Sequence, residues 1–163
     1  MATQPSLGSE LRDFYAAESA RIENEFSVER NGRAAVMGRT AIVDSIALRL
    51  WQELISPQVD GPANFALVAL GGFGRRWLFP HSDVDILFLH AGGEPSQALK
   101  NSIRSFSQEI WDLKLKLSPA TRTLAECERF DPANVEFAIS LLDCRYLAGD
   151  KAVFDRLHGA VIP

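Results

Sequence analysis

The chain has 163 residues, enough for one well-buried domain and few for two. Its 47% hydrophobic and 23% charged residues are ordinary for a soluble globular protein, and its net charge of −4 argues against a protein that coats nucleic acid through its overall field. Its two cysteines give no disulfide framework, and we expect neither a membrane span nor a signal peptide, since no apolar run is suited to either. These features predict a cytoplasmic protein with no nucleic-acid or membrane partner.

The N-terminal part of the sequence predicts two helices. Apolar residues recur at roughly helical spacing over residues 9 to 27 and again from about 34 to 54. Residues 56 to 64 carry two prolines and a glycine, which predicts a loop. We therefore expect a helical segment over residues 1–60 and a second region over 61–163, with both in one compact unit.

The middle of the sequence predicts strands. Phe65–Leu70 is a continuous apolar run that ends at a glycine pair, as a strand buried on both faces would, and Val84–His90 is a second such run. An amphipathic segment from about 95 to 113 predicts a helix. The alternation of Leu115–Ser118 predicts a third strand after it.

Two short helices are expected after the third strand. Thr123 and Glu126 have the spacing of a capping box, which predicts a helix through about Arg129. The pair Asp131-Pro132 supplies an N-cap and a first-turn proline for another helix, to about Leu142.

The sequence ends on a last expected helix, bracketed by Asp150 and Gly159. The order along the chain is thus helix, helix, strand, strand, helix, strand, helices. This order predicts an α+β fold in which helices pack on a small mixed β-sheet.

Two aspartates mark the start of the second predicted strand. Asp83 and Asp85 are two residues apart, so their side chains leave the same face, which Leu87 and Leu89 continue. Two carboxylates this close repel each other, and burying them is costly unless a cation compensates. Magnesium prefers oxygen ligands, so the pair suits a magnesium site. An Asp-x-Asp by itself is more often part of a surface loop or a cap.

The glycine pair at the end of the first strand adds a second feature. Gly71 and Gly72 carry no side chains, so their backbone N–H groups can approach a phosphate closely. Ser82 adds a hydroxyl, and Arg75 and Arg76 add positive charge. A phosphate-binding turn that faces a carboxylate pair is what nucleotidyl transfer requires. A lone Gly-Gly is more often a turn, but the combination favours a metal-dependent transfer site.

These motifs together resemble the DNA polymerase β-type nucleotidyltransferase superfamily. Within it, ALGGFGRRWLFPHSDVDILFL (69–89) is similar to the N-terminal catalytic domain of bacterial PII-protein uridylyltransferases. WDLKL (111–115), TRTLAEC (121–127) and LLDCRYLAGD (141–150) are similar to further motifs of that family. The resemblance covers the chain from about Arg33 to its end, and it implies a polymerase β-like fold with N-terminal helices.

The resemblance also implies a chemistry, in which UTP binds with Mg²⁺ and a tyrosine hydroxyl of the signalling protein PII attacks the α-phosphate. Pyrophosphate leaves, and the modified PII acts in nitrogen regulation. Asp83 and Asp85 would hold the metal ions. Nucleotide contacts would come from Gly71, Gly72, Arg75, Ser82 and Arg122, the last at a phosphate or on the base side.

Two alternatives stay open at this point. One is a transferase for another nucleotide, such as ATP, or for another acceptor. The other is a degenerate nucleotidyltransferase fold that binds a nucleotide or a protein without turnover, because residues 115–123 lack the third carboxylate that the superfamily often uses. The family's phosphohydrolase and glutamine-sensing domains lie outside these 163 residues, so we expect neither activity from the chain.

Overall fold

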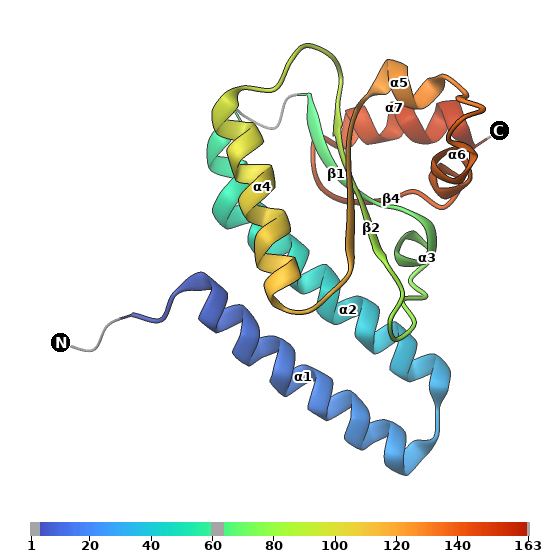
Figure 1. Ribbon diagram of the computed structural model, residues 1–163. Coiled ribbons are helices and arrows are strands. Elements are labelled where there is room, and N and C mark those ends of the chain that lie inside the picture. Colours follow the sequence, from blue (N-terminus) through green and yellow to red (C-terminus); the bar gives the residue numbers. More distant parts are fainter. Residues whose placement is uncertain (1–3, 60–63, 163) are drawn as a thin grey trace.

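In a computed structural model of the chain, residues 4–59 and 64–162 are described. They form a four-stranded sheet between two groups of helices (Figure 1). The strands are β1 (Phe65–Ala69), β2 (Val84–His90), β3 (Leu117–Thr123) and β4 (Arg145–Gly149). The α-helices are α1 (Leu7–Glu29), α2 (Gly32–Leu50), α3 (Gly71–Gly74), α4 (Gln97–Asp112), α5 (Leu124–Glu128), α6 (Val135–Leu141) and α7 (Lys151–Val161).

The two predicted N-terminal helices are present and begin slightly earlier than expected. Side-chain caps explain both starts, because Ser6 accepts from the Ser9 N–H and Asn31 from the Ala34 N–H. The regular α2 helix ends at Leu50, and the chain continues as a π-helical turn, η1 (Trp51–Ile55), and a 3₁₀ turn, η2 (Ser56–Gln58). Residues 60–63 of the expected loop, and with them the expected boundary at 60/61, lie outside the described residues.

The sheet has the order β3-β2-β1-β4 and is mixed. β1 pairs antiparallel with both β2 and β4, whereas β2 and β3 run parallel. The first two predicted strands are therefore neighbours, and the α+β class with a small mixed sheet is confirmed.

Alternating residues of the strands face two separate cores. Val84, Ile86 and Phe88 of β2 pack with α2, η1 and α4 on one face of the sheet. Leu87 and Leu89 pack with α5, α6 and α7 on the other. This division follows the alternation predicted from the sequence, and α1 packs along α2 (Figure 1).

The third and fourth strands differ from the prediction. β3 begins at Leu117, two residues later than the predicted Leu115, and extends past Ser118 to Thr123, where the capping box with Glu126 is confirmed. β3 is an edge strand, and a proline such as Pro119 is tolerated in such a strand. β4 (Arg145–Gly149) was not predicted, because five residues between two helices carry little strand periodicity.

Two local features also differ from expectation. The helix expected from Asp131-Pro132 begins at Val135 with Asn134 as its cap, because Asp131 instead closes a turn by accepting from the Ala133 N–H. Among the described residues, no helix combines the length and the apolar character that crossing a membrane requires.

Candidate active site

The two aspartates lie at the N-terminal end of β2. Asp83 is exposed and immediately precedes the strand, and Asp85 is partly buried within it. Asp85 leaves the same face as Leu87 and Leu89, whose side chains are buried under α5, α6 and α7. The strand therefore holds the Asp85 carboxylate at the edge of an apolar core.

The electrostatics of Asp85 reflect this position. Burial, and then the neighbouring Asp83 carboxylate, raise the pKa of Asp85, while a hydrogen bond with Ser118 lowers it. Ser118 is the residue opposite Asp85 in the parallel pairing of β2 and β3. The pair is thus a site of unfavourable negative charge, which a bound cation would relieve.

The glycine pair forms the first turn of α3 and lies beside these carboxylates. Gly71 has φ +54°, and a β-carbon placed on it would lie 3.0 Å from Oδ2 of Asp85. The N–H of Leu70, the residue before α3, donates to the backbone carbonyl of Asp85 at 3.0 Å. The first turn of a helix leaves N–H groups without intrahelical partners. Such groups at Gly71 and Gly72 are available beside the carboxylate.

Of the arginine and serine predicted for the phosphates, Arg75 lies next to this turn and Ser82 lies in the loop before β2. A β-carbon on Gly72 would lie 3.8 Å from Nη2 of Arg75, so the guanidinium is next to the glycine pair. Arg75 Nη1 donates to Asp143 Oδ2 at 2.5 Å, in an ion pair that is largely exposed on the arginine side. Ser82 is partly buried in the loop before Asp83, and its N–H donates to the Phe79 carbonyl.

Arg122, the last of the predicted site residues, lies further along β3 than the position opposite Asp85. It pairs in register with Leu89, four residues beyond Ser118 along β3. At about 3.3 Å per residue, its backbone is roughly 13 Å from the position opposite Asp85. Its guanidinium lies 5.5 Å from the ring centroid of Phe137 and borders a cavity of about 750 Å³ between α5 and α6.

Several neighbours of the site were not singled out from the sequence. Ser118 lies opposite Asp85 in the sheet, Asp143 pairs with Arg75, and the Cβ of Ser140 would lie 3.9 Å from a β-carbon on Gly71. Asp143 lies in LLDCRYLAGD (141–150), which resembles a motif of the uridylyltransferases and was the available signal, whereas Ser118 lies outside these motifs. Their partners are distant in sequence, so only the fold could reveal these contacts.

The donor set fits a hard cation such as Mg²⁺ at Asp83 and Asp85, since both groups are carboxylates and burial, followed by repulsion from Asp83, raises the pKa of Asp85. Within residues 4–59 and 64–162, no three His, Cys, Asp or Glu side chains cluster as a metal site. Asp112, the acidic residue that precedes β3 most closely in sequence, is exposed and accepts from Gln108 on the surface of α4. The arrangement therefore offers two carboxylates, backbone donors and Arg75.

Comparison with known proteins agrees with the fold and the motifs, although no family model matches the chain. The chain is 32% identical over 169 residues to a bifunctional uridylyltransferase/uridylyl-removing enzyme of Haemophilus influenzae, a match of 99% of this chain and 19% of that protein. It is 35% identical to the enzyme of the same description from Cupriavidus metallidurans, over 97% of this chain and 18% of that protein. For the Ralstonia nicotianae enzyme, the identity is 36% over 88% of this chain and 16% of that protein.

The four-stranded mixed sheet with packed helices is compatible with the polymerase β-like nucleotidyltransferase class. More narrowly, the homologues of this chain, 32–36% identical over 88–99% of its length, are bifunctional uridylyltransferase/uridylyl-removing enzymes. It spans less than a fifth of the length of these relatives.

Proposed function

We propose that this chain is a magnesium-dependent nucleotidyltransferase that transfers UMP from UTP to a tyrosine of the PII signalling protein. The observation that carries the proposal is the contact between the Gly71 turn and Asp85 near the start of β2. This contact brings backbone donors for a phosphate next to carboxylates for a cation. The similarity to uridylyltransferases supports UTP as the nucleotide.

In the proposed reaction, the tyrosine hydroxyl oxygen forms a bond to the α-phosphorus of UTP. The bond from the α-phosphorus to the bridging oxygen breaks, pyrophosphate leaves with the electron pair, and the hydroxyl proton passes to water. Asp83 and Asp85 would hold Mg²⁺, which when bound supplies positive charge against the phosphate oxygens. The N–H groups of Gly71 and Gly72, with Arg75 and Ser82, would orient the triphosphate.

The missing third carboxylate limits the expected rate. General-base help and acceptor positioning each contribute orders of magnitude in catalysis, and β3 offers no acidic residue. We therefore expect Mg²⁺–UTP to bind in the micromolar to millimolar range typical of substrates, with slow modification of PII by this chain alone. The absence of an acidic residue from β3 also favours the alternative of a nucleotide-binding module without turnover.

The test combines binding and turnover. Calorimetric titration with UTP and with ATP, each with Mg²⁺ and then with a chelator, measures nucleotide preference and metal dependence. Pyrophosphate release and the mass of PII then report transfer. We expect UTP to bind only with Mg²⁺, and Asp83→Asn and Asp85→Asn to abolish most of that dependence. Asp155→Asn, the same change on the exposed face of α7, is the matched control and should bind as the parent does.

Each outcome separates the candidates. Binding of Mg²⁺–UTP followed by pyrophosphate release supports the transferase, and binding without release supports the module. Preferential use of ATP would replace UTP in the proposal. Metal-independent binding that survives both aspartate substitutions would refute the assigned site.

A further inference from the structure

A single arginine connects the glycine turn of the candidate site to helix α2. Arg145 of β4 forms a two-pronged ion pair with Asp44 of α2, with Nη1–Oδ2 and Nη2–Oδ1 distances of 3.0 and 2.9 Å. The two side chains are only 16% and 15% exposed. Charges this deep are stable only when paired and hydrogen-bonded, and the geometry here provides both.

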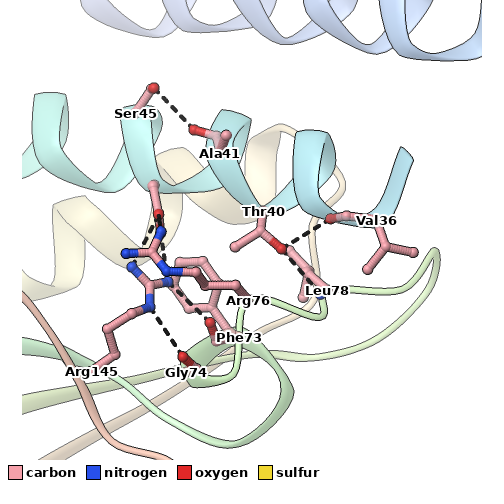
Figure 2. Close-up of polar contacts among 10 residues, drawn as sticks. Val36, Thr40, Ala41, Ser45, Phe73, Gly74, Arg76, Leu78 and Arg145 are labelled. Atoms are coloured by element: carbon pink, nitrogen blue, oxygen red, sulfur yellow. Dashed lines mark hydrogen bonds and ion pairs between the residues drawn. The ribbon is translucent and has the colours of Figure 1, made fainter. Parts of the chain in front are cut away.

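The same guanidinium also holds the end of α3. Nη2 of Arg145 donates to the Phe73 carbonyl at 3.0 Å, and Nε donates to the Gly74 carbonyl at 3.1 Å (Figure 2). The guanidinium carbon, Cζ of Arg145, lies over the face of the Phe73 ring, 5.3 Å from its centroid. Arg145 satisfies the Gly74 carbonyl at the end of the helix and adds a second bond to the Phe73 carbonyl, which also accepts from the Arg76 N–H at 3.2 Å.

A second contact ties α2 to the segment after α3. The hydroxyl of Thr40, which is 1% exposed, donates to the Val36 carbonyl and accepts from the Leu78 N–H at 3.2 Å (Figure 2). Arg76 adds a looser contact, with Nη1 at 3.6 Å from Asp44 Oδ2. Helix α2 thus holds the chain on both sides of the loop that carries Arg75.

The position of α3 depends on such outside contacts because the helix has only four residues. Gly74 sits so close to the chain before β4 that a β-carbon on it would lie 1.9 Å from the Asp143 carbonyl oxygen. At the other end of α3, Gly71 faces Asp85. One helical turn therefore separates the carbonyls that Arg145 holds from the backbone that borders the carboxylate site.

We infer that Arg145 and Asp44 are positioning residues, which hold α3 so that its backbone at Gly71 lies beside Asp85. The consequence for nucleotide binding rests on the proposed function, whereas the effect on α3 does not. Neither residue touches the proposed substrate; each acts through the backbone of α3. A displacement of about 1 Å in such a site is enough to cost roughly 100-fold in rate.

The experiment compares Arg145→Lys with Asp44→Asn by amide hydrogen exchange without nucleotide. The probes are the four amides whose hydrogen bonds define the turn, those of Gly74, Arg75, Arg76 and Trp77. Lysine keeps the charge but lacks the planar fork that reaches Asp44 and both carbonyls together. We expect exchange at these amides to accelerate by about tenfold or more in Arg145→Lys and by less in Asp44→Asn, where the carbonyl contacts persist, while β2 stays protected.

The matched control is Arg49→Lys, which changes an exposed arginine of α2 that pairs with Glu10 and Glu53. It should leave exchange in α3 unchanged. In the nucleotide arm, Arg145→Lys should weaken binding of Mg²⁺–UTP by about tenfold or more, beyond what any change in melting temperature explains.

The exchange measurement and the nucleotide-binding measurement test separate claims. If the parent chain binds no nucleotide, the proposed function fails, but the exchange data still decide the positioning role. If Arg145→Lys accelerates exchange equally in α3 and β2, or in neither, the pair is a general stabilising contact and the inference is wrong. Should Arg145→Lys not fold, unchanged exchange of the four amides in Asp44→Asn would overturn it in the same way.

Discussion

Gly71 and Asp85 lie so close together that a β-carbon on the glycine would be 3.0 Å from Oδ2 of the aspartate. Gly71 also has φ +54°, a left-handed conformation that costs other residues about 1–2 kcal/mol. We expect Gly71→Ala to lower the free energy of unfolding by about this amount and to weaken nucleotide binding through the crowded carboxylate. Chemical denaturation and calorimetry measure the two effects.

Gly93 offers the matched control, because its φ is +79° and a β-carbon there would meet nothing within 4 Å. Gly93→Ala should show the backbone cost alone, with nucleotide binding unchanged. If both variants bind nucleotide as the parent does, the contact between Gly71 and Asp85 has no functional role.

Asp85→Asn is expected to leave the metal-free chain as stable as the parent or more stable at neutral pH. Burial and Asp83 raise the pKa of Asp85, so the folded chain takes up a proton more readily than the unfolded chain. The contribution of Asp85 to stability is therefore fully present below its unfolded pKa and is lost as the pH rises through its folded pKa. The difference in melting temperature between variant and parent should shrink as the pH falls into that window.

The comparison needs a chelator, because bound cation would stabilise the parent by mass action. Asp83→Asn removes the neighbouring charge and should also spare stability. A large loss of thermal stability in both variants would indicate that the aspartates are structural, contrary to the proposed site.

Arg75 and Arg122 are expected to contribute unequally to nucleotide affinity. Arg75 lies next to Gly72, whereas the guanidinium of Arg122 lies over Phe137, and its backbone is roughly 13 Å along β3 from the position opposite Asp85. Arg75→Ala should therefore weaken Mg²⁺–UTP binding more than Arg122→Ala, as calorimetry would report. If Arg122→Ala has the larger effect, the triphosphate lies nearer the cavity between α5 and α6 than the glycine turn.

Asp150 is expected to stabilise the fold through two backbone contacts. Its carboxylate accepts from the Asn64 N–H at 2.7 Å and the Ala152 N–H at 2.9 Å, so it caps α7 and ties that helix to the chain before β1. Loss of such a cap costs about 0.5–2 kcal/mol, and Asp150→Ala should lose this much at neutral pH.

The pH dependence of this effect has the opposite sign to that of Asp85. The bond from the Asn64 N–H is the main cause that lowers the pKa of Asp150, so its stabilisation is present above the unfolded pKa and is lost as the pH falls through the folded pKa. Denaturation of Asp150→Ala and the parent should converge at low pH. Asp155→Ala, at an exposed ion pair of the same helix, should change stability little at any pH.

The two cysteines should be inert in the native chain. Both are buried and free, and burial raises the pKa of Cys127 to about 12. At pH 8 almost no reactive thiolate is present, so alkylation by iodoacetamide should be far slower than for free cysteine and should become rapid in denaturant. Mass spectrometry measures the extent of reaction. Rapid native modification of Cys127 would mean that the cavity beside it opens readily.

The elements with strong periodicity or capping signals were predicted well. The apolar runs of β1 and β2, the helices α1, α2 and α4, and the Thr123 capping box all depend on residues near one another in the chain. The extent of β3 and the existence of β4 were missed, because both are edge strands whose pairing partners lie elsewhere in the sequence. Their residues carry little strand signal of their own.

The sequence by itself determined the local chemistry of the site. Asp83 and Asp85 are two residues apart, so their side chains leave the same face of the strand, and the glycines permit a turn with positive φ. Those features follow from bonded geometry over a few residues. Only the tertiary structure decided that Gly71 borders Asp85, that Arg122 lies over Phe137, and that Arg145 joins Asp44 to α3. Such contacts join segments up to 101 residues apart, and strand order and register, which no local pattern encodes, bring them together.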